Sequence, residues 1–81
     1  MNLQTVRLDK AERIATLTLN RPERLNAMNR LMLDEINRAC NDVEADAEMR
    51  VLVVTGAGTA FSSGFDLKEQ MEAGPGGVPQ W

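Results

Sequence analysis

A short apolar run behind a long amphipathic stretch constrains the fold of this chain more than any other feature. The run is Val51-Leu52-Val53-Val54, whose continuous apolar and β-branched character is typical of a strand covered on both faces. Upstream, apolar side chains recur every three or four positions, which predicts a helix from about residue 26 or 27 to about residue 45. Alternating residues from Arg13 to Leu19 predict a strand before that helix. Strand, helix and buried strand form a βαβ unit with parallel strands and a right-handed crossover, so we expect an α/β fold.

The N-terminal segment adds a hairpin to this unit. Val6 and Leu8 alternate with polar residues and predict a short first strand, and the polar segment 9–12 predicts a turn. The first two strands should therefore pair in antiparallel fashion. The residues of the apolar helix stripe are Met28, Met32, Ile36, Ala39, Cys40 and Val43. Its place on this stripe makes Cys40 a core residue rather than a nucleophile.

Length and charge exclude several classes of protein. A chain of 81 residues makes one small domain, and a net charge of −3 disfavours nucleic acid or an anionic membrane as partner. No apolar run approaches the roughly 20 residues of a membrane span, and the N-terminus lacks a signal-peptide pattern. A single cysteine and no histidine disfavour a metal site and leave no internal disulfide. We therefore expect a cytoplasmic protein without a bound metal.

The segment Phe61-Ser62-Ser63-Gly64-Phe65-Asp66-Leu67-Lys68 carries the strongest hint of chemistry. Gly64 gives backbone freedom next to the Phe65 N–H, and a short helix is predicted from Asp66 to about Ala73. Asp66 and Glu69 have the spacing of a capping box, with Asp66 as N-cap. Such a turn can aim a main-chain donor at a negative oxygen. From these residues alone, an oxyanion site and a plain turn are about equally supported.

Other motifs favour simpler interpretations. Gly56-Ala57-Gly58 follows a strand, but Phe61 stands where a dinucleotide-binding fingerprint needs glycine, and the G-K-[ST] of a phosphate-binding loop is missing. The carboxylates of Asp66, Glu69 and Glu72 fit helix capping and a solvated face better than a general base. Arg21 and Arg24 flank Pro22, and a solvated loop is favoured over a phosphate contact.

Two motifs resemble the crotonase superfamily, the enoyl-CoA hydratase/isomerase family. Asn20-Arg21-Pro22-Glu23-Arg24-Leu25-Asn26-Ala27-Met28 resembles the family's N-R-P-x-x-x-N-A-[LM] signature. Val53-Val54-Thr55-Gly56-Ala57-Gly58, followed by the segment 61–68, resembles its strand and F-[SC]-[AS]-G-x-D-[LI] loop. The resemblance extends from about residue 3 to about residue 72. It implies the N-terminal β-β-α units of an incomplete crotonase-like spiral fold over residues 1–73, followed by a Gly/Pro-rich mobile end at 74–81.

The resemblance also implies a substrate and a site. The substrate would be an acyl-CoA or enoyl-CoA thioester, and no separate cofactor is needed because coenzyme A is part of the substrate. By analogy, the Phe65 N–H is one of two backbone donors to the thioester oxygen, and Gly64 forms the turn that supports it. The positions matched to the coenzyme A site are Arg24, Leu25, Ala27, Ser63, Leu67 and Lys68. Family members are homo-oligomers, either trimers or hexamers.

Parts of the family's machinery have no counterpart in this chain. The second oxyanion donor and the catalytic glutamates come later in family members, so we assign no catalytic base. We therefore expect the N-terminal part of a longer enzyme, inactive without its C-terminal part and prone to self-association because Val51–Val54 would be under-covered. The alternative is a stand-alone, non-catalytic module that binds a partner chain.

Overall fold

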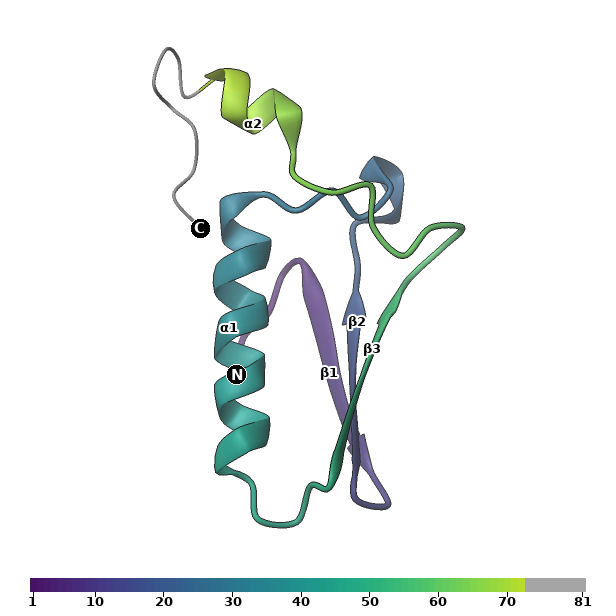
Figure 1. Cartoon of the computed structure of the whole chain (residues 1–81), viewed down its shortest axis with the longest axis vertical. Helices are drawn as coiled ribbons and strands as arrows, with labels where there is room; N and C mark the ends of the chain where they lie inside the picture. The colour runs from purple at the N-terminus through teal and green to yellow at the C-terminus, as the bar shows by residue number, and fades with distance from the viewer. Residues whose placement is uncertain (73–81) are drawn as a thin grey trace.

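The computed structural model describes residues 1–72 of the chain. Figure 1 shows a small sheet with one long helix beside it. The elements are β1 (Val6–Ala11), β2 (Ile14–Leu19), the 3-10 turn η1 (Pro22–Arg24), α1 (Arg30–Ala45), β3 (Val51–Gly56) and α2 (Leu67–Glu72). The mobile end predicted for residues 74–81, and the helix end predicted at Ala73, lie outside the described residues.

The sheet has the predicted topology. Its strand order is β1-β2-β3, with β1 antiparallel to β2 and β2 parallel to β3. In this register Leu17 of β2 lies opposite Leu8 on one side and Val54 on the other. Both the hairpin and the parallel strands of the βαβ unit are therefore confirmed.

The hairpin turn is tighter than predicted. Strand β1 continues through Ala11, which pairs with Ile14, so the polar segment 9–11 belongs to the strand rather than to a turn. The turn consists of Glu12 and Arg13, with φ values of 51° and 69°. Two consecutive left-handed residues match the right-handed twist of the strands that they join. Arg13 therefore ends the turn and does not begin β2.

Helix α1 begins later than predicted, at Arg30 rather than at residue 26 or 27. Leu25 and Asn26 have φ values of 52° and 53°, in the left-handed region, and such residues cannot continue a right-handed helix. Asn29 is the N-cap, and its Oδ1 accepts a hydrogen bond from the Met32 N–H at 2.8 Å. The predicted end at Ala45 is confirmed.

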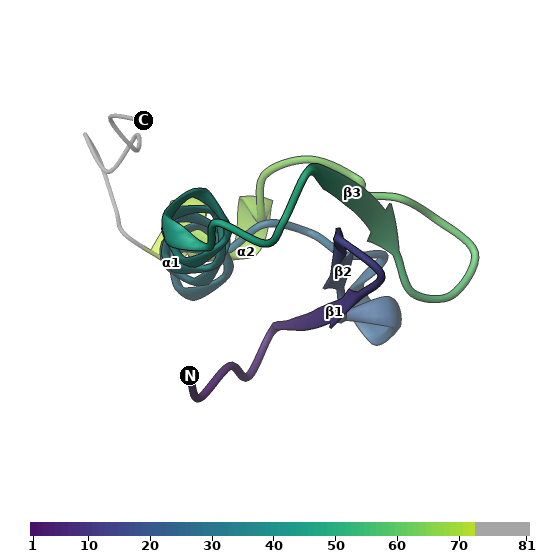
Figure 2. The ribbon, with the colours of Figure 1, turned by 90° about the horizontal axis from the view of Figure 1, so that it is seen from below.

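Helix α1 packs on one face of the sheet, mainly over β1 and β2 (Figure 2). The buried core consists of Val6, Leu17, Leu19, Met32 and Ala39. Strand β3 differs from the prediction of a strand covered on both faces. Val51 and Val53 on one face are 51% and 43% exposed, and Leu52 and Val54 on the other are 36% and 44% exposed. Helix α1 packs mainly over β1 and β2, and β3 lies at the edge of the sheet. Residues 1–72 therefore leave both faces of β3 incompletely covered.

Glu35 occupies a core position that was not predicted. Its side chain is buried, and its carboxylate accepts hydrogen bonds from the Thr5 hydroxyl at 2.6 Å and from the Thr5 N–H at 2.7 Å. The Gln4 N–H donates to the same carboxylate at 2.9 Å. Glu35 thus ties the segment before β1 to α1, and it fits the helix stripe because it lies between Met32 and Ala39.

Candidate functional site

The two motifs of the sequence meet in the structure. Met28 and Phe65 form an isolated parallel bridge, in which the Met28 N–H donates to Gly64 O at 2.7 Å. On the other side of this bridge the Asp66 N–H donates to Met28 O at 3.0 Å. The Ser63 N–H also donates to Leu25 O at 3.0 Å. Backbone hydrogen bonds thus hold the loop before α2 against the loop before α1.

The direction of the Phe65 N–H follows from this bridge. Gly64 C=O and Phe65 N–H belong to one trans peptide unit, in which carbonyl and amide point in opposite directions. Since Gly64 O accepts from Met28, the Phe65 N–H points to the opposite side of the loop. Gly64 has a φ of 97°, and an added Cβ would meet no atom within 4 Å. Glycine is therefore required here by backbone conformation, not by lack of space.

Asn26 joins these loops to the loop after β3. Its side chain is fully buried, and its Nδ2 donates to Ala57 O at 2.9 Å and to Ala60 O at 2.8 Å. Its Oδ1 accepts from the Arg21 N–H at 2.8 Å. Asn26 makes these three bonds from a left-handed backbone, with a φ of 53°. Sequence reasoning missed this role, although Asn26 is part of the first motif.

Arg21 and Asp66 form a largely buried ion pair. Arg21 Nη1 lies 3.2 Å from Asp66 Oδ2, and the exposed fractions of the two side chains are 15% and 8%. The same Nη1 donates to Ala27 O. The favoured prediction of a solvated loop at Arg21 is therefore wrong, because the side chain turns inward to a carboxylate and a carbonyl.

Asp66 is the N-cap of α2, as predicted. Its Oδ1 accepts from the Glu69 N–H at 3.1 Å. This hydrogen bond, and then the hydrogen bond and charge of Arg21, hold the pKa of Asp66 below its ordinary value. The capping box is not reciprocal, since the Glu69 carboxylate accepts from the Arg30 N–H at 2.7 Å. Asp66 is thus a structural carboxylate that stays ionised at neutral pH.

The residues matched to the coenzyme A site lie around this junction. Arg24 ends η1 and is exposed, while Leu25 next to it is 52% exposed and lies beside Ser63. Ala27 is half-buried. Leu67 and Lys68 are exposed on the first turn of α2, directly after Asp66. The structure therefore brings the first loop against Ser63, with Arg24 directly before Leu25 in that loop and Lys68 on the helix that follows Ser63.

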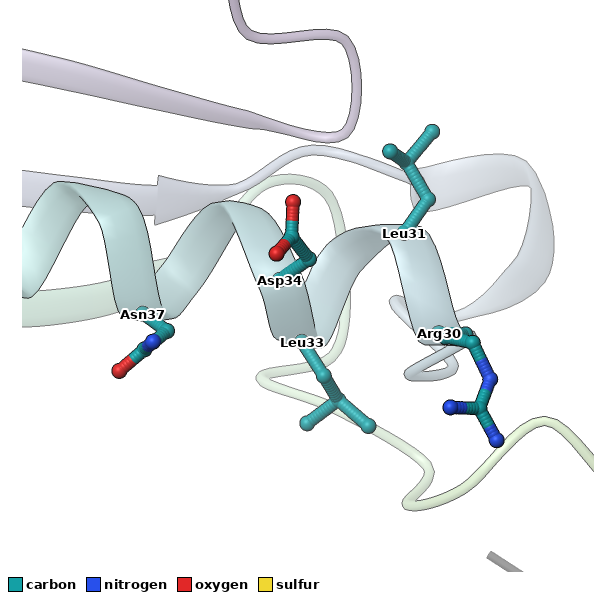
Figure 3. Close-up of a pocket in the computed structure, with 5 residues that line it drawn as sticks. All are labelled: Arg30, Leu31, Leu33, Asp34 and Asn37. Carbon is teal, nitrogen blue, oxygen red and sulfur yellow. The ribbon is translucent and has the colours of Figure 1, made fainter.

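A separate groove runs along α1 (Figure 3). Its volume is about 660 Å³, and its lining residues are Arg30, Leu31, Leu33, Asp34 and Asn37. None of the predicted site residues lines it, so this groove is not the predicted acyl-CoA site. Within residues 1–72 no helix is long and apolar enough to cross a bilayer, and no group of three or more side chains is arranged to hold a metal ion.

Comparison with known proteins places this arrangement in a family. Residues 9–79 match the sequence profile of the family described as enoyl-CoA hydratase/isomerase. The short-chain-enoyl-CoA hydratase of Clostridium acetobutylicum is 38% identical over 89% of this chain. The hydroxycinnamoyl-CoA hydratase-lyase of Pseudomonas fluorescens is 41% identical over 89% of it.

Solved structures agree with the sequence matches. An enoyl-CoA hydratase/isomerase from Xanthobacter autotrophicus Py2 superposes with a TM-score of 0.88 and 51% identity over 91% of this chain. The β-β-α elements are therefore those of the crotonase fold, as the resemblance implied. The chain spans 28% of the Clostridium protein and 28% of the Xanthobacter chain, so it corresponds to just over a quarter of these relatives. On sequence and fold together, the chain belongs to the enoyl-CoA hydratase/isomerase family, within the crotonase superfamily.

Proposed function

We propose that this chain supplies one half of the oxyanion site, and part of the coenzyme A site, of an enoyl-CoA hydratase/isomerase-type enzyme. The donor is the Phe65 N–H, supported by the Gly64 turn. In reactions of acyl-CoA thioesters, negative charge develops on the thioester oxygen. A preorganised backbone donor stabilises such charge by about 3 kcal/mol.

One observation carries this proposal. The bond from the Met28 N–H to Gly64 O, at 2.7 Å, fixes the peptide unit that contains the Phe65 N–H. A donor fixed before the substrate arrives needs no reorganisation during the reaction, which is the physical basis of oxyanion stabilisation. The N–H points away from Met28, and we place the thioester on that side of the loop.

The coenzyme A part of the proposal uses the surrounding residues. Arg24 and Lys68 supply positive charge for the phosphates of coenzyme A. The exposed apolar side chains of Leu25 and Leu67, with Ala27 and Ser63 near them, supply contacts for the pantetheine and adenine parts. No cofactor beyond the substrate's own coenzyme A is proposed.

The remaining machinery lies outside this chain in the proposal. Because the chain spans 28% of its relatives, we propose that the catalytic base and the second oxyanion donor come from the rest of the family's length. The 81 residues alone are then inactive, and homo-oligomer formation and a cytoplasmic location remain predictions for the whole enzyme.

A chimera tests the proposal directly. Residues 1–72 replace the matching segment of the Xanthobacter autotrophicus relative, and hydration of a short enoyl-CoA is followed by the loss of enoyl thioester absorbance. Gly64→Val introduces a β-branched side chain at a φ of 97° and should displace the Phe65 N–H. We expect kcat to fall roughly a hundredfold, while KM changes little.

The matched control is Glu12→Val in the hairpin turn. Glu12 also has a left-handed φ, of 51°, but the turn between β1 and β2 lies at the end of the sheet opposite the loop before α2 (Figure 1). The same valine there should lower stability and leave kcat unchanged. Equal turnover of Gly64→Val and the unmutated chimera would reject the role of the Phe65 N–H.

A further inference from the structure

We infer that the Arg21–Asp66 ion pair is a positioning device that sets the Phe65 N–H for the reaction. This inference rests on the proposed function and assigns a role to two side chains outside the oxyanion site. Neither side chain is placed against the substrate. Each acts through the backbone on which it is held.

Arg21 contacts both strands of the bridge that orients Phe65. Its Nη1 donates to Ala27 O, directly before Met28, and pairs at 3.2 Å with Asp66, directly after Phe65. One guanidinium therefore spans the Met28–Phe65 bridge from the side. Separation of the two loops would break the Arg21–Asp66 pair and the bridge bond from Met28 to Gly64 together.

Asp66 is fixed at three points. Its N–H donates to Met28 O at 3.0 Å, its Oδ2 pairs with Arg21, and its Oδ1 accepts from the Glu69 N–H at 3.1 Å. The residue after Phe65 thus has little freedom to rotate. The pair is partly shielded from water, with exposed fractions of 15% and 8%, so it is less screened than the surface pairs of this chain.

A displacement of this donor would affect the transition state more than the bound substrate. Small errors in the position of catalytic groups, of about 1 Å, cost roughly a hundredfold in rate. An interaction that strengthens as charge develops contributes to kcat rather than to KM. Loosening the pair should therefore lower kcat selectively.

The test uses Arg21→Met and Asp66→Asn in the chimera of residues 1–72. Methionine keeps an unbranched stem, and asparagine keeps both the volume and the N-cap of α2. We expect each variant to lower kcat about tenfold or more, with KM within about twofold. The kcat of the double variant should be no lower than that of the slower single variant, because both changes remove the same ion pair.

The surface pair Arg7–Asp9 provides the matched control. Its Nε–Oδ2 distance is 3.0 Å, and its side chains are 62% and 60% exposed. Arg7→Met and Asp9→Asn should leave kcat unchanged. The inference is overturned if folded Arg21 and Asp66 variants keep the kcat of the unmutated chimera. It is also overturned if their kcat loss disappears at a lower temperature, where the folded population is restored, because the pair then serves stability alone.

A second measurement uses the 81-residue chain, which has two phenylalanines, with Val53→Lys added so that the exposed strand β3 does not drive self-association. With ¹⁵N-labelled phenylalanine, Arg21→Met, which is distant in sequence from both phenylalanines, should shift the amide resonance of Phe65 and leave that of Phe61 in place, whereas Arg7→Met should move neither. An unshifted Phe65 resonance would contradict the inference. If Gly64→Val abolishes turnover but Arg21→Met does not, this inference alone fails. If Gly64→Val has no effect, the proposed function fails.

Discussion

The side-chain amide of Asn26 donates to the carbonyl of Ala57 at 2.9 Å, across 31 positions of the sequence. This bond joins the loop before α1 to the loop after β3, on either side of the βαβ crossover. Asn26 is fully buried and has a left-handed φ of 53°. Asparagine suits both demands, because its short polar side chain tolerates that backbone and can pair in the interior.

In the chimera of residues 1–72, Asn26→Ala should lower the free energy of unfolding by at least about 2 kcal/mol. The change removes the partners of Ala57 O, Ala60 O and the Arg21 N–H, and each polar group left unsatisfied costs about 1–3 kcal/mol. Urea unfolding followed by circular dichroism measures this cost. Asn2→Ala, at an exposed position, should stay within about 0.5 kcal/mol. A similar cost for both variants would contradict the role of Asn26.

The limits of sequence reasoning lie in contacts that no local pattern encodes. Periodicity predicted the hairpin, the parallel strand pair and the end of α1. It placed the start of α1 too early because Leu25 and Asn26 adopt left-handed backbone, and Asn26 is held there by carbonyls 31 and 34 positions away. The pairing of Arg21 with Asp66 spans 45 positions, and a carboxylate next to an arginine in space leaves no trace in spacing.

Glu35 shows where a signal existed. It falls three positions after Met32 and four before Ala39, two residues of the predicted stripe, and a charged residue at such a position requires buried partners. Those partners, Gln4 and Thr5, lie before the first strand, where no motif points to them. Similarly, the apolar run of β3 correctly predicted a strand but not which residues cover it.

Glu35→Gln should reduce the loss of stability that occurs as the pH falls below neutral. Burial raises the pKa of Glu35, but the hydrogen bonds of Thr5 and Gln4 and the charge of Arg38 together hold that pKa below its ordinary value. A depressed folded-state pKa gives stability that is complete above the unfolded pKa, about 4.3, and lost as the pH falls through the folded-state pKa. The unmutated chain should therefore lose stability more steeply than the variant below about pH 4.3.

Thermal unfolding from pH 7 to pH 3, with each variant carried in the chimera of residues 1–72, provides the measurement. The control is Glu44→Gln, which changes an exposed glutamate of the same helix and should keep the slope of the unmutated chain. At pH 7 we expect Glu35→Gln to be less stable by about 1.5–3 kcal/mol, because hydrogen bonds to a charged group are lost. Parallel profiles for the unmutated chain and Glu35→Gln would show that this carboxylate is not held in its ionised form.

Strand β3 should make the 81-residue chain self-associate. Its valines and leucine are exposed on both faces, and its outer edge has no neighbouring strand within residues 1–72. Exposed apolar edge strands pair with further chains, and a lysine on such a strand prevents this. Light scattering after size exclusion should show species larger than 8.9 kDa for the unmutated chain and monomers for Val53→Lys.

Leu31→Lys is the control for this experiment. Leu31 is also an exposed apolar residue, 38% accessible, but it lies on α1. The Leu31→Lys substitution should leave the self-association of the chain unchanged. A cooperatively unfolding monomer of the unmutated chain would instead favour the alternative of a stand-alone module.

The basic residues at the junction should set affinity for coenzyme A rather than rate. In the chimera, Arg24→Met and Lys68→Met should each raise KM for the enoyl-CoA about three- to tenfold and leave kcat unchanged, because a phosphate contact is the same in ground and transition states. Added salt should shrink the difference, since exposed charges are screened. Arg50→Met, at an exposed position before β3, should match the unmutated chimera.

An enoyl-pantetheine thioester, which lacks the nucleotide of coenzyme A, provides a sharper test. Equal KM values for all variants on this substrate would support phosphate recognition by Arg24 and Lys68. A KM defect that persists on this substrate would instead assign Arg24 and Lys68 to the structure of the loop.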